Sequence, residues 1–286
     1  MVAPLLRVPA SGYGGSGYKD LFGTGGTVVG VTTALGALDK GGIVQWSVDQ
    51  TIGYMLANKD DIYNRTTDQA FGYLRWYHKR FKESDYDDPN VDIHNAHVGV
   101  LNDLADNGTA VHEWIEAYWT GGFEPDLYRP EQVQMVEAFL DWEAEHEIEV
   151  HATELTVFGD GYAGTSDFYV TVDGVPMLVD GKSARAVRDS HVAQLAALGA
   201  ADYAVERVFE YEEGAKAHKD MWFRQRDIPA FNTYGVLQFR PDDDDKPRFC
   251  QLHVIPQEQI DVAFDLFMAA KNARLATKKL ATLRKG

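Results

Sequence analysis

Cysteine is nearly absent from this 286-residue chain, in which Cys250 is the single thiol. One cysteine cannot form an intrachain disulfide, and it excludes a four-cysteine zinc or iron–sulfur site within the chain. No run of about 18 apolar residues is present, so we expect no transmembrane helix. The N-terminus lacks a basic region followed by an apolar segment, which predicts no secretory signal and a cytoplasmic location.

Positive charge is scarce as well. The chain has 27 Lys and Arg against 44 Asp and Glu, which gives a net charge of −17. Such a net charge by itself argues against a nucleic-acid partner, but the distribution of the charges along the chain matters more than their sum. Residues 271–286 contain six basic residues and no acid. Apolar residues make up 45% of the chain, enough for one large domain or for a domain with a helical lobe.

The segment from Glu154 to Lys182 is the most informative part of the chain. Three apolar, β-prone runs are separated by Gly and Asp turns, which predicts a three-strand antiparallel meander. Asp167 lies on the second run, and Asp180 and Lys182 lie two residues apart on the third, so these two face the same side. A hairpin turn at residues 173–174 would place Asp167 opposite them.

Two carboxylates and an ammonium group on one sheet face are costly to bury as bare charges. A divalent metal ion would offset that cost, and oxygen ligands suit Mg²⁺ or Mn²⁺. The lysine could then hold a water molecule or a developing phosphate charge. The alternative is a surface hairpin with solvated charges. The apolar run from Met177 to Val179 predicts a buried third strand and favours a site.

Hydrophobic periodicity predicts the other elements and a division of the chain. We expect helices over residues 67–81, 95–119, 130–146, 188–202 and 256–283, a strand over 205–211 and a hairpin from 236–240 and 248–255. Residues 1–26 are rich in Gly and predict a flexible arm. Residues 27–129 predict a helical lobe that contributes His112, and residues 130–286 predict the core with a basic C-terminal helix. A lone histidine on a helix is more often a surface residue than a metal ligand.

Taken in order, these residues resemble the PD-(D/E)xK nuclease superfamily. Within it the chain is similar to the RecB-type exonuclease group, which includes phage-encoded and CRISPR-associated members. The resemblance covers about residues 28–255 and rests on His112, Glu154, Gly164-x-x-Asp167, Val179-Asp180-Gly181-Lys182 and Gln194-Leu195. It implies an α/β (mixed α+β) fold with a restriction-endonuclease-like core, in which helices flank a central mixed sheet and a helical lobe precedes it.

The resemblance also implies a role for each residue of the motif. The implied ligands of Mg²⁺ or Mn²⁺ are His112, Asp167, Asp180 and the backbone carbonyl of Gly181. Lys182 would orient the attacking water, and Gln194 would position the site or the DNA. Glu154 matches an acidic residue that the family often places before the first aspartate. The resemblance leaves open whether Glu154 binds the metal ion or lies next to the residues that do. Close relatives often carry Tyr four residues after the glutamine, where this chain has Leu198.

The implied activity is that of a metal-dependent deoxyribonuclease, foremost an exonuclease in phage or bacterial DNA replication, recombination or repair. Its partner would be DNA, with no membrane, and a homo-oligomer or a recombination protein would be a further partner. The location would be the bacterial cytoplasm. The alternatives are a non-catalytic DNA-binding or recombination-partner protein on the same fold, and a hydrolase of small phosphate esters. Many CRISPR-associated relatives carry four iron–sulfur cysteines, which this chain lacks.

Overall fold

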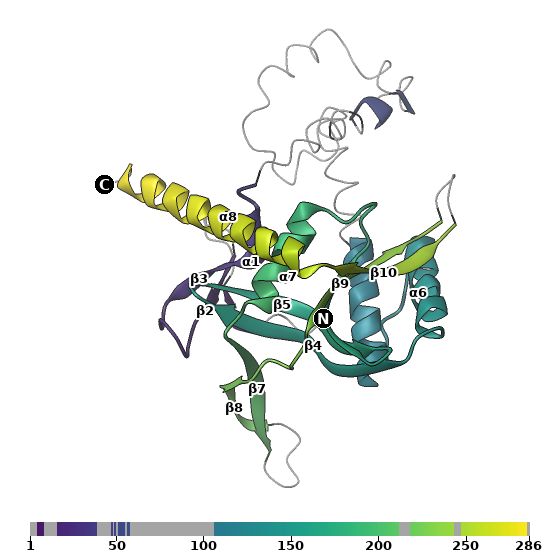
Figure 1. The fold of residues 1–286 in the computed structure, drawn as a ribbon, viewed down its shortest axis with the longest axis horizontal. Helices are drawn as coiled ribbons and strands as arrows, with labels where there is room; N and C mark the ends of the chain where they lie inside the picture. The colour runs from purple at the N-terminus through teal and green to yellow at the C-terminus, as the bar shows by residue number, and fades with distance from the viewer. Residues whose placement is uncertain are drawn as a thin grey trace. The chain divides into compact units, whose positions relative to one another are not determined.

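The computed structural model describes residues 5–8, 16–38, 47, 49, 51–54, 56–57, 106–211, 218–242 and 247–284. The chain divides into two compact units, one formed by residues 1–38 and 108–286 and the other by residues 39–107. The first unit contains the sheet and every residue of the predicted site (Figure 1). No helix in the described ranges is long and apolar enough to cross a membrane.

The described strands form one ten-stranded sheet of mixed direction. Its path runs β1-β2-β3-β5-β4-β7-β8, while β6 pairs with β5 and β9, and β9 pairs with β10. The pairs β3–β5 and β6–β9 are parallel, and the other pairs are antiparallel. The bounds are β1 Arg7–Val8, β2 Gly17–Lys19, β3 Thr27–Gly30, β4 Ile148–Gly159, β5 Tyr162–Val172, β6 Val175–Lys182, β7 Tyr203–Tyr211, β8 His218–Arg226, β9 Thr233–Arg240 and β10 Phe249–Ile255.

Strands β4, β5 and β6 form the predicted antiparallel meander. Asp173 and Gly174 both have positive φ, 50° and 78°, and connect the paired residues Val172 and Val175. Two consecutive positive φ values in a two-residue loop are those of a type I′ turn, which matches the twist of a hairpin. This turn sets the register between β5 and β6, and the prediction of a hairpin here is confirmed.

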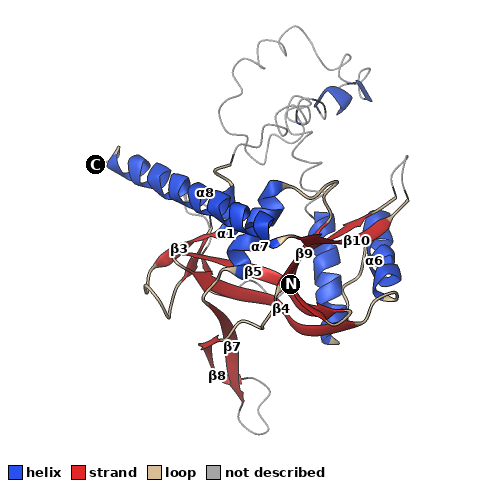
Figure 2. Cartoon of the chain, viewed as in Figure 1, coloured by secondary structure: helices blue, strands red, loops and turns tan. Residues whose placement is uncertain are grey.

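Helices cover both faces of the sheet (Figure 2). The first face carries α1 (Val31–Leu35), α7 (Asp189–Gly199) and α8 (Gln257–Leu283), and the second carries α6 (Pro130–Glu143) and a helix that includes residues 106–120. Neighbouring residues of β5 belong to different cores, since Tyr169 packs in the first cluster while Phe168 and Val170 pack in the second. Side chains alternate across a strand, so both faces are buried. The predicted α+β class, with helices flanking a central mixed sheet, is confirmed.

The N-terminal region differs from its prediction. The predicted arm contains β1 and β2, which join the sheet through β3, and Tyr18 is buried there. Asp20 explains how a Gly-rich segment becomes ordered: its carboxylate accepts hydrogen bonds from the backbone N–H of Gly23, from Thr24 and from the hydroxyl of Tyr203. These bonds close a local loop and tie it to β7.

Other differences concern the predicted helical lobe and one missed strand. Residues 27–30 form β3 rather than a helix, and the helix that carries His112 belongs to the same compact unit as the sheet. The predicted helix over 67–81, like most of the lobe, lies outside the described residues. Strand β8 was not predicted, because its run from His218 to Arg226 is strongly polar and charged.

We predict that Phe267→Ala lowers the free energy of unfolding by about 3–5 kcal/mol, since Phe267 lies on the inner side of α8, is fully buried, and leaves a cavity when truncated. Urea denaturation followed by tryptophan fluorescence measures the change. Leu275→Ala, at a position 43% exposed on the same helix, is the matched control and should shift stability by about 0.5 kcal/mol or less. Equal effects of the two substitutions would contradict the observed packing of α8.

Candidate metal centre

The β5–β6 hairpin brings two carboxylates and one ammonium group together. Asp167 Oδ2 accepts a hydrogen bond of 2.8 Å from the backbone N–H of Gly181. Lys182 Nζ lies 2.5 Å from Asp180 Oδ2, and Asp180 is only 1% exposed. The register that pairs Phe168 with Val179 places Asp167 and Asp180 at the next position of the two strands. The sequence-based expectation that these carboxylates lie opposite one another is therefore met in the hairpin.

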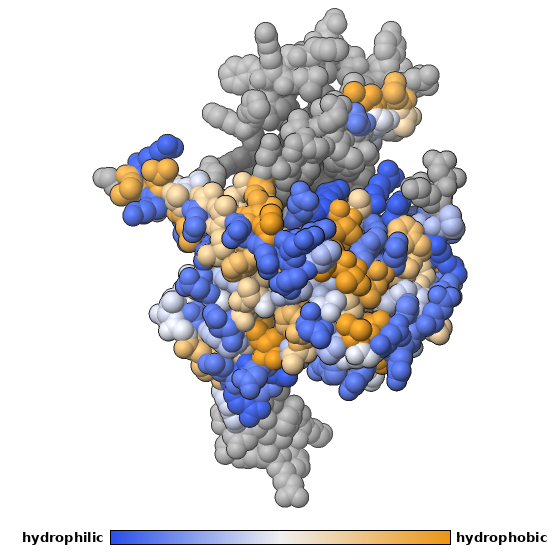
Figure 3. Space-filling view, in the orientation of Figure 1, coloured by the Kyte–Doolittle hydropathy of each residue, from blue (hydrophilic) through white to orange (hydrophobic). Residues whose placement is uncertain are grey.

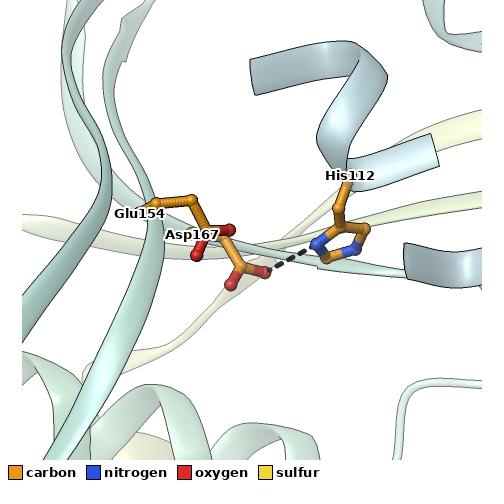
Figure 4. Close-up of side chains that lie close together, drawn as sticks. All are labelled: His112, Glu154 and Asp167. Atoms are coloured by element: carbon orange, nitrogen blue, oxygen red, sulfur yellow. Dashed lines mark ion pairs between the residues drawn. The ribbon is translucent and has the colours of Figure 1, made fainter. Parts of the chain in front are cut away.

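His112 reaches the same place from the helix over residues 106–120 (Figure 4). Its Nδ1 lies 3.6 Å from Asp167 Oδ2, and its imidazole packs edge-on against the ring of Phe239 at 5.5 Å. Gly181 makes this approach possible, because a Cβ at that position would lie 2.8 Å from His112 Nε2. A contact that short is not tolerated, so any larger residue at position 181 would displace the imidazole.

Glu154 enters the site through an irregular stretch of β4. The register against β5 shifts between Val150 and Ala152, and Glu154 itself has φ of 46°. A left-handed backbone conformation at a non-glycine residue costs roughly 1–3 kcal/mol and persists where the surrounding structure requires it. Bulges commonly re-aim side chains beside functional sites. Strain at Glu154 is therefore a local sign that its carboxylate has a function.

His112, Glu154 and Asp167 form a group able to hold a metal ion. Each offers one ligand atom, and these atoms lie within 4.8 Å of one another (Figure 4). One imidazole nitrogen and two carboxylate oxygens suit a divalent ion such as Mn²⁺ or Mg²⁺. This set of ligand atoms fits the divalent metal ion that the resemblance to the nuclease superfamily implies.

Asp180 supports the same conclusion from its own surroundings. Its Oδ1 accepts a 3.1 Å hydrogen bond from Nε2 of Gln194 on α7. Its Oδ2 is buried and has no hydrogen bond of regular geometry, so the ion pair with Lys182 alone balances it. With Asp167 and Glu154 nearby, the buried carboxylates outnumber the buried ammonium groups here. Uncompensated buried negative charge is unfavourable, and a bound cation would relieve it.

The pKa values of the carboxyl groups are raised. Burial raises the pKa of Glu154 to about 8, and the negative charges of Asp167 and Glu116 add to the effect. Burial also raises the pKa of Asp180 to about 6, although the charge of Lys182 opposes the shift. For Asp167 burial outweighs both Lys182 and the Gly181 hydrogen bond, and its pKa is raised as well. Burial is the largest cause of all three shifts, because it disfavours the charged form of a carboxyl group.

The pKa values of the two basic side chains, His112 and Lys182, shift in opposite directions. Burial, together with the positive charge of Lys182, lowers the pKa of His112 to about 4, so the imidazole is neutral near pH 7 and has a lone pair for a metal ion. Burial alone would lower the pKa of Lys182, yet Asp180 and Asp167 raise it by more than burial lowers it. Lys182 therefore stays an ammonium group.

A cavity of about 360 Å³ opens beside this centre. Its lining includes Asp167 and Gln194 of the centre, together with Arg7, Tyr18 and Thr165. The hydroxyls of Tyr18 and Thr165 lie 3.4 Å apart. This part of the site was missed from the sequence, because the N-terminal segment was predicted to be a flexible arm. No local motif in that segment signals the cavity.

The structure thus brings His112, Glu154 and Asp167 into one group and places Asp180, Lys182 and Gln194 directly beside it. Sequence reasoning missed Glu116, whose charge raises the pKa of Glu154. Glu116 follows His112 by four residues on one helix, and this spacing puts both side chains on the same helix face. The four-residue spacing from His112 is the sequence signal that could have placed Glu116 near the site.

Comparisons with known proteins assign no family to the chain. No family model matches, and no curated protein matches. Among solved structures, the chain is similar to the one described as the crystal structure of LHK-Exo in complex with dAMP, at 13% identity and a TM-score of 0.28. That match covers 62% of this chain and 86% of the other. A likeness this distant carries no argument about activity, which must come from the site itself.

We predict a pH dependence of stability that Glu154 controls. Its folded pKa of about 8 exceeds the ordinary 4.5, so the folded state binds more protons than the unfolded state between these values. The free energy of unfolding of the metal-free protein should therefore fall as pH rises from about 6.5 to 8, the part of the range above the ordinary pKa of His112. Thermal unfolding in EDTA measures the trend.

Mn²⁺ should reverse this trend, because the ion competes with the proton for the same carboxylate. The increase in Tm that Mn²⁺ causes should be larger at pH 8 than at pH 6.5. Glu154→Gln should remove both the fall in stability with rising pH and the larger effect of Mn²⁺ at pH 8. Glu131→Gln, at an exposed position, should keep both. If Glu154→Gln retains the full pH trend, Glu154 is not the titrating group.

Proposed function

We propose that this chain is a divalent-metal-dependent deoxyribonuclease that hydrolyses phosphodiester bonds, and that it acts as an exonuclease of the RecB type within the PD-(D/E)xK superfamily. The observation that carries the proposal is the convergence of a neutral imidazole and two carboxylates, within 4.8 Å, beside a buried and charged lysine. Phosphodiester hydrolysis needs a held cation, an oriented water and a fixed positive charge, and this arrangement can supply all three.

The proposed ligands are His112, Asp167 and Asp180, joined by the carbonyl of Gly181, with Glu154 as a further ligand. Bound there, Mg²⁺ or Mn²⁺ would activate water as a nucleophile near neutral pH and offset negative charge on the phosphate. Glu154 is proposed as a ligand because its strained backbone aims the carboxylate at His112 and Asp167. A strain of that kind has no evident structural benefit at this position.

Lys182 is proposed to act on the reacting atoms. Its ammonium group is held by Asp180, remains charged and is mostly buried, so its position is defined. From there it would donate hydrogen bonds to the attacking water and to the phosphate oxygen on which charge develops. Electrostatic stabilisation of this kind is strongest where solvent is excluded. Gln194 is proposed as a positioning residue, since it holds one oxygen of Asp180.

DNA is proposed as the substrate because of the space beside the centre. The cavity of about 360 Å³ lies in the range of small-ligand sites and borders Asp167, so it offers room for a nucleotide of the cleaved strand. Its hydroxyl groups and Arg7 are donors suited to phosphate and sugar oxygens. The net charge of −17 makes a defined and local contact surface a requirement for such a substrate.

We predict that Lys182→Ala lowers the rate of DNA cleavage by about 10²-fold or more, because the charge developing in the transition state loses its fixed donor. Mn²⁺ and DNA binding should persist in calorimetry, and Asp180→Ala should instead weaken Mn²⁺ binding. Lys278→Ala, an exposed lysine on α8, is the matched control with wild-type cleavage.

EDTA should stop cleavage by the wild-type protein, and added Mg²⁺ or Mn²⁺ should restore it. DNA binding without any metal-dependent cleavage would refute the enzyme and leave a DNA-binding protein. Cleavage by Lys182→Ala at the wild-type rate would remove the role proposed for Lys182.

We predict that linear DNA is degraded from its ends while covalently closed circular DNA of the same sequence stays intact. Gel electrophoresis of the two substrates, with end labels on the linear one, measures this difference. A nicked or linearised control plasmid shows that the circular substrate becomes degradable once an end exists. Efficient cutting of closed circles would establish an endonuclease instead.

A further inference from the structure

Helix α8 carries an apolar stripe on the side that faces away from the fold. The helix is 27 residues long, about 40 Å, and its inner side packs against α7 and α1 through Ile260, Ala263 and Phe267. Its second half projects beyond the sheet, and residues 275–284 are all exposed (Figures 1 and 3). The outer stripe consists of the exposed Val262, Ala269, Ala273, Ala276, Leu280 and Leu283 and of Leu266, which is half-buried and also packs at the margin of the first core.

The spacing of the outer stripe is that of a coiled-coil seam. Its members are separated alternately by four and three residues over three heptads, which is a period of 3.5. Val262, Leu280 and Leu283 are 71%, 56% and 69% exposed, so no described part of the chain covers the two ends of the stripe. A helix needs one apolar stripe to pack on its own domain, and α8 has a second one.

We propose that the outer stripe of α8 pairs antiparallel with α8 of a second copy of this chain. The charges that flank the stripe favour this partner. Asp265 precedes Leu266, Lys279 precedes Leu280, and Asn272 lies midway, seven residues from each. A two-fold axis beside Asn272 places Asp265 of each copy next to Lys279 of the other, giving two symmetric ion pairs along the seam.

The parallel alternative is disfavoured by the same side chains. In a parallel coiled coil, a residue that directly precedes a member of the stripe, such as Lys279, faces the residue numbered five higher on the other helix. Lys279 would then face Arg284 of the other copy, and like charges at this position repel. The antiparallel arrangement also brings Val262 near Leu280 of the second copy, so large residues at the ends enclose the small alanines at the centre.

Lys271 fixes where the projecting part begins. Its Nζ donates a 2.6 Å hydrogen bond to the carbonyl of Asp160 and lies 5.4 Å from the centre of the Tyr162 ring. This anchor lies on the inner side of α8, so the outer stripe keeps its orientation on a helix that is held by its own domain. The pairing is independent of the proposed nuclease activity, since no residue of the metal centre lies on α8.

The mass of the full chain in solution tests the proposal. Sedimentation equilibrium over increasing protein concentration should give a mass that rises toward twice 31.9 kDa. Leu280→Glu combined with Leu283→Glu should raise the concentration at half-dimerisation by at least tenfold. Leu275→Glu is the matched control, because Leu275 is an exposed leucine of the same turns that lies off the stripe.

Charge reversal and crosslinking test the antiparallel register. Lys279→Asp should weaken the dimer, and adding Asp265→Lys to it should restore association. In a Cys250→Ala background, Asn272→Cys should form a disulfide-linked dimer under mild oxidation, whereas Lys278→Cys should not. Circular dichroism checks that each variant is folded.

A mass of one chain at every concentration, or a dimer unaffected by the Leu280 and Leu283 substitutions, would overturn the pairing. Failure of the charge reversal to restore association, with no crosslink at position 272, would overturn the antiparallel register. Metal-dependent DNA cleavage measured on the same samples reports separately on the proposed function.

Discussion

The close packing of charged groups at the β5–β6 hairpin is the constraint on which the rest of the structure depends. Asp180 is buried, and its charge is opposed by one ammonium group and one amide. Asp167 and Glu154 add further carboxylates to the same place. The folded chain keeps these groups together only because two packed cores, one on each sheet face, hold β5 and β6 in position.

Several features that look unrelated follow from that constraint. Gly181 has no Cβ because the imidazole of His112 occupies the space. Glu154 adopts a left-handed φ so that its side chain points at the same centre. The type I′ turn at Asp173 and Gly174 sets the register that brings Asp167 to the level of Asp180. Backbone geometry and electrostatics thus converge on one site, and such convergence is typical of functional rather than structural residues.

The protein has two regions of different character. Around the candidate metal centre, buried charged groups are held in place by hydrogen bonds and an ion pair. On the outer side of α8, by contrast, apolar side chains are exposed to solvent on a well-formed helix. A site for chemistry requires preorganisation, whereas a surface for association requires only a regular array of accessible groups. The two regions can therefore act independently, and neither requires a change in the other.

Local pattern alone determined the meander, the helices α6, α7 and α8 and the residues Asp167, Asp180 and Lys182, because strand alternation, Asp-Gly turns and helical periodicity act over a few residues. The tertiary structure alone decided that the Gly-rich N-terminus joins the sheet, since that depends on Asp20 bonding to Tyr203 far along the chain. It also decided the approach of His112 and the strained conformation of Glu154. The resemblance named both residues for the site, but how they reach it depends on packing between segments distant in sequence, which local patterns do not encode.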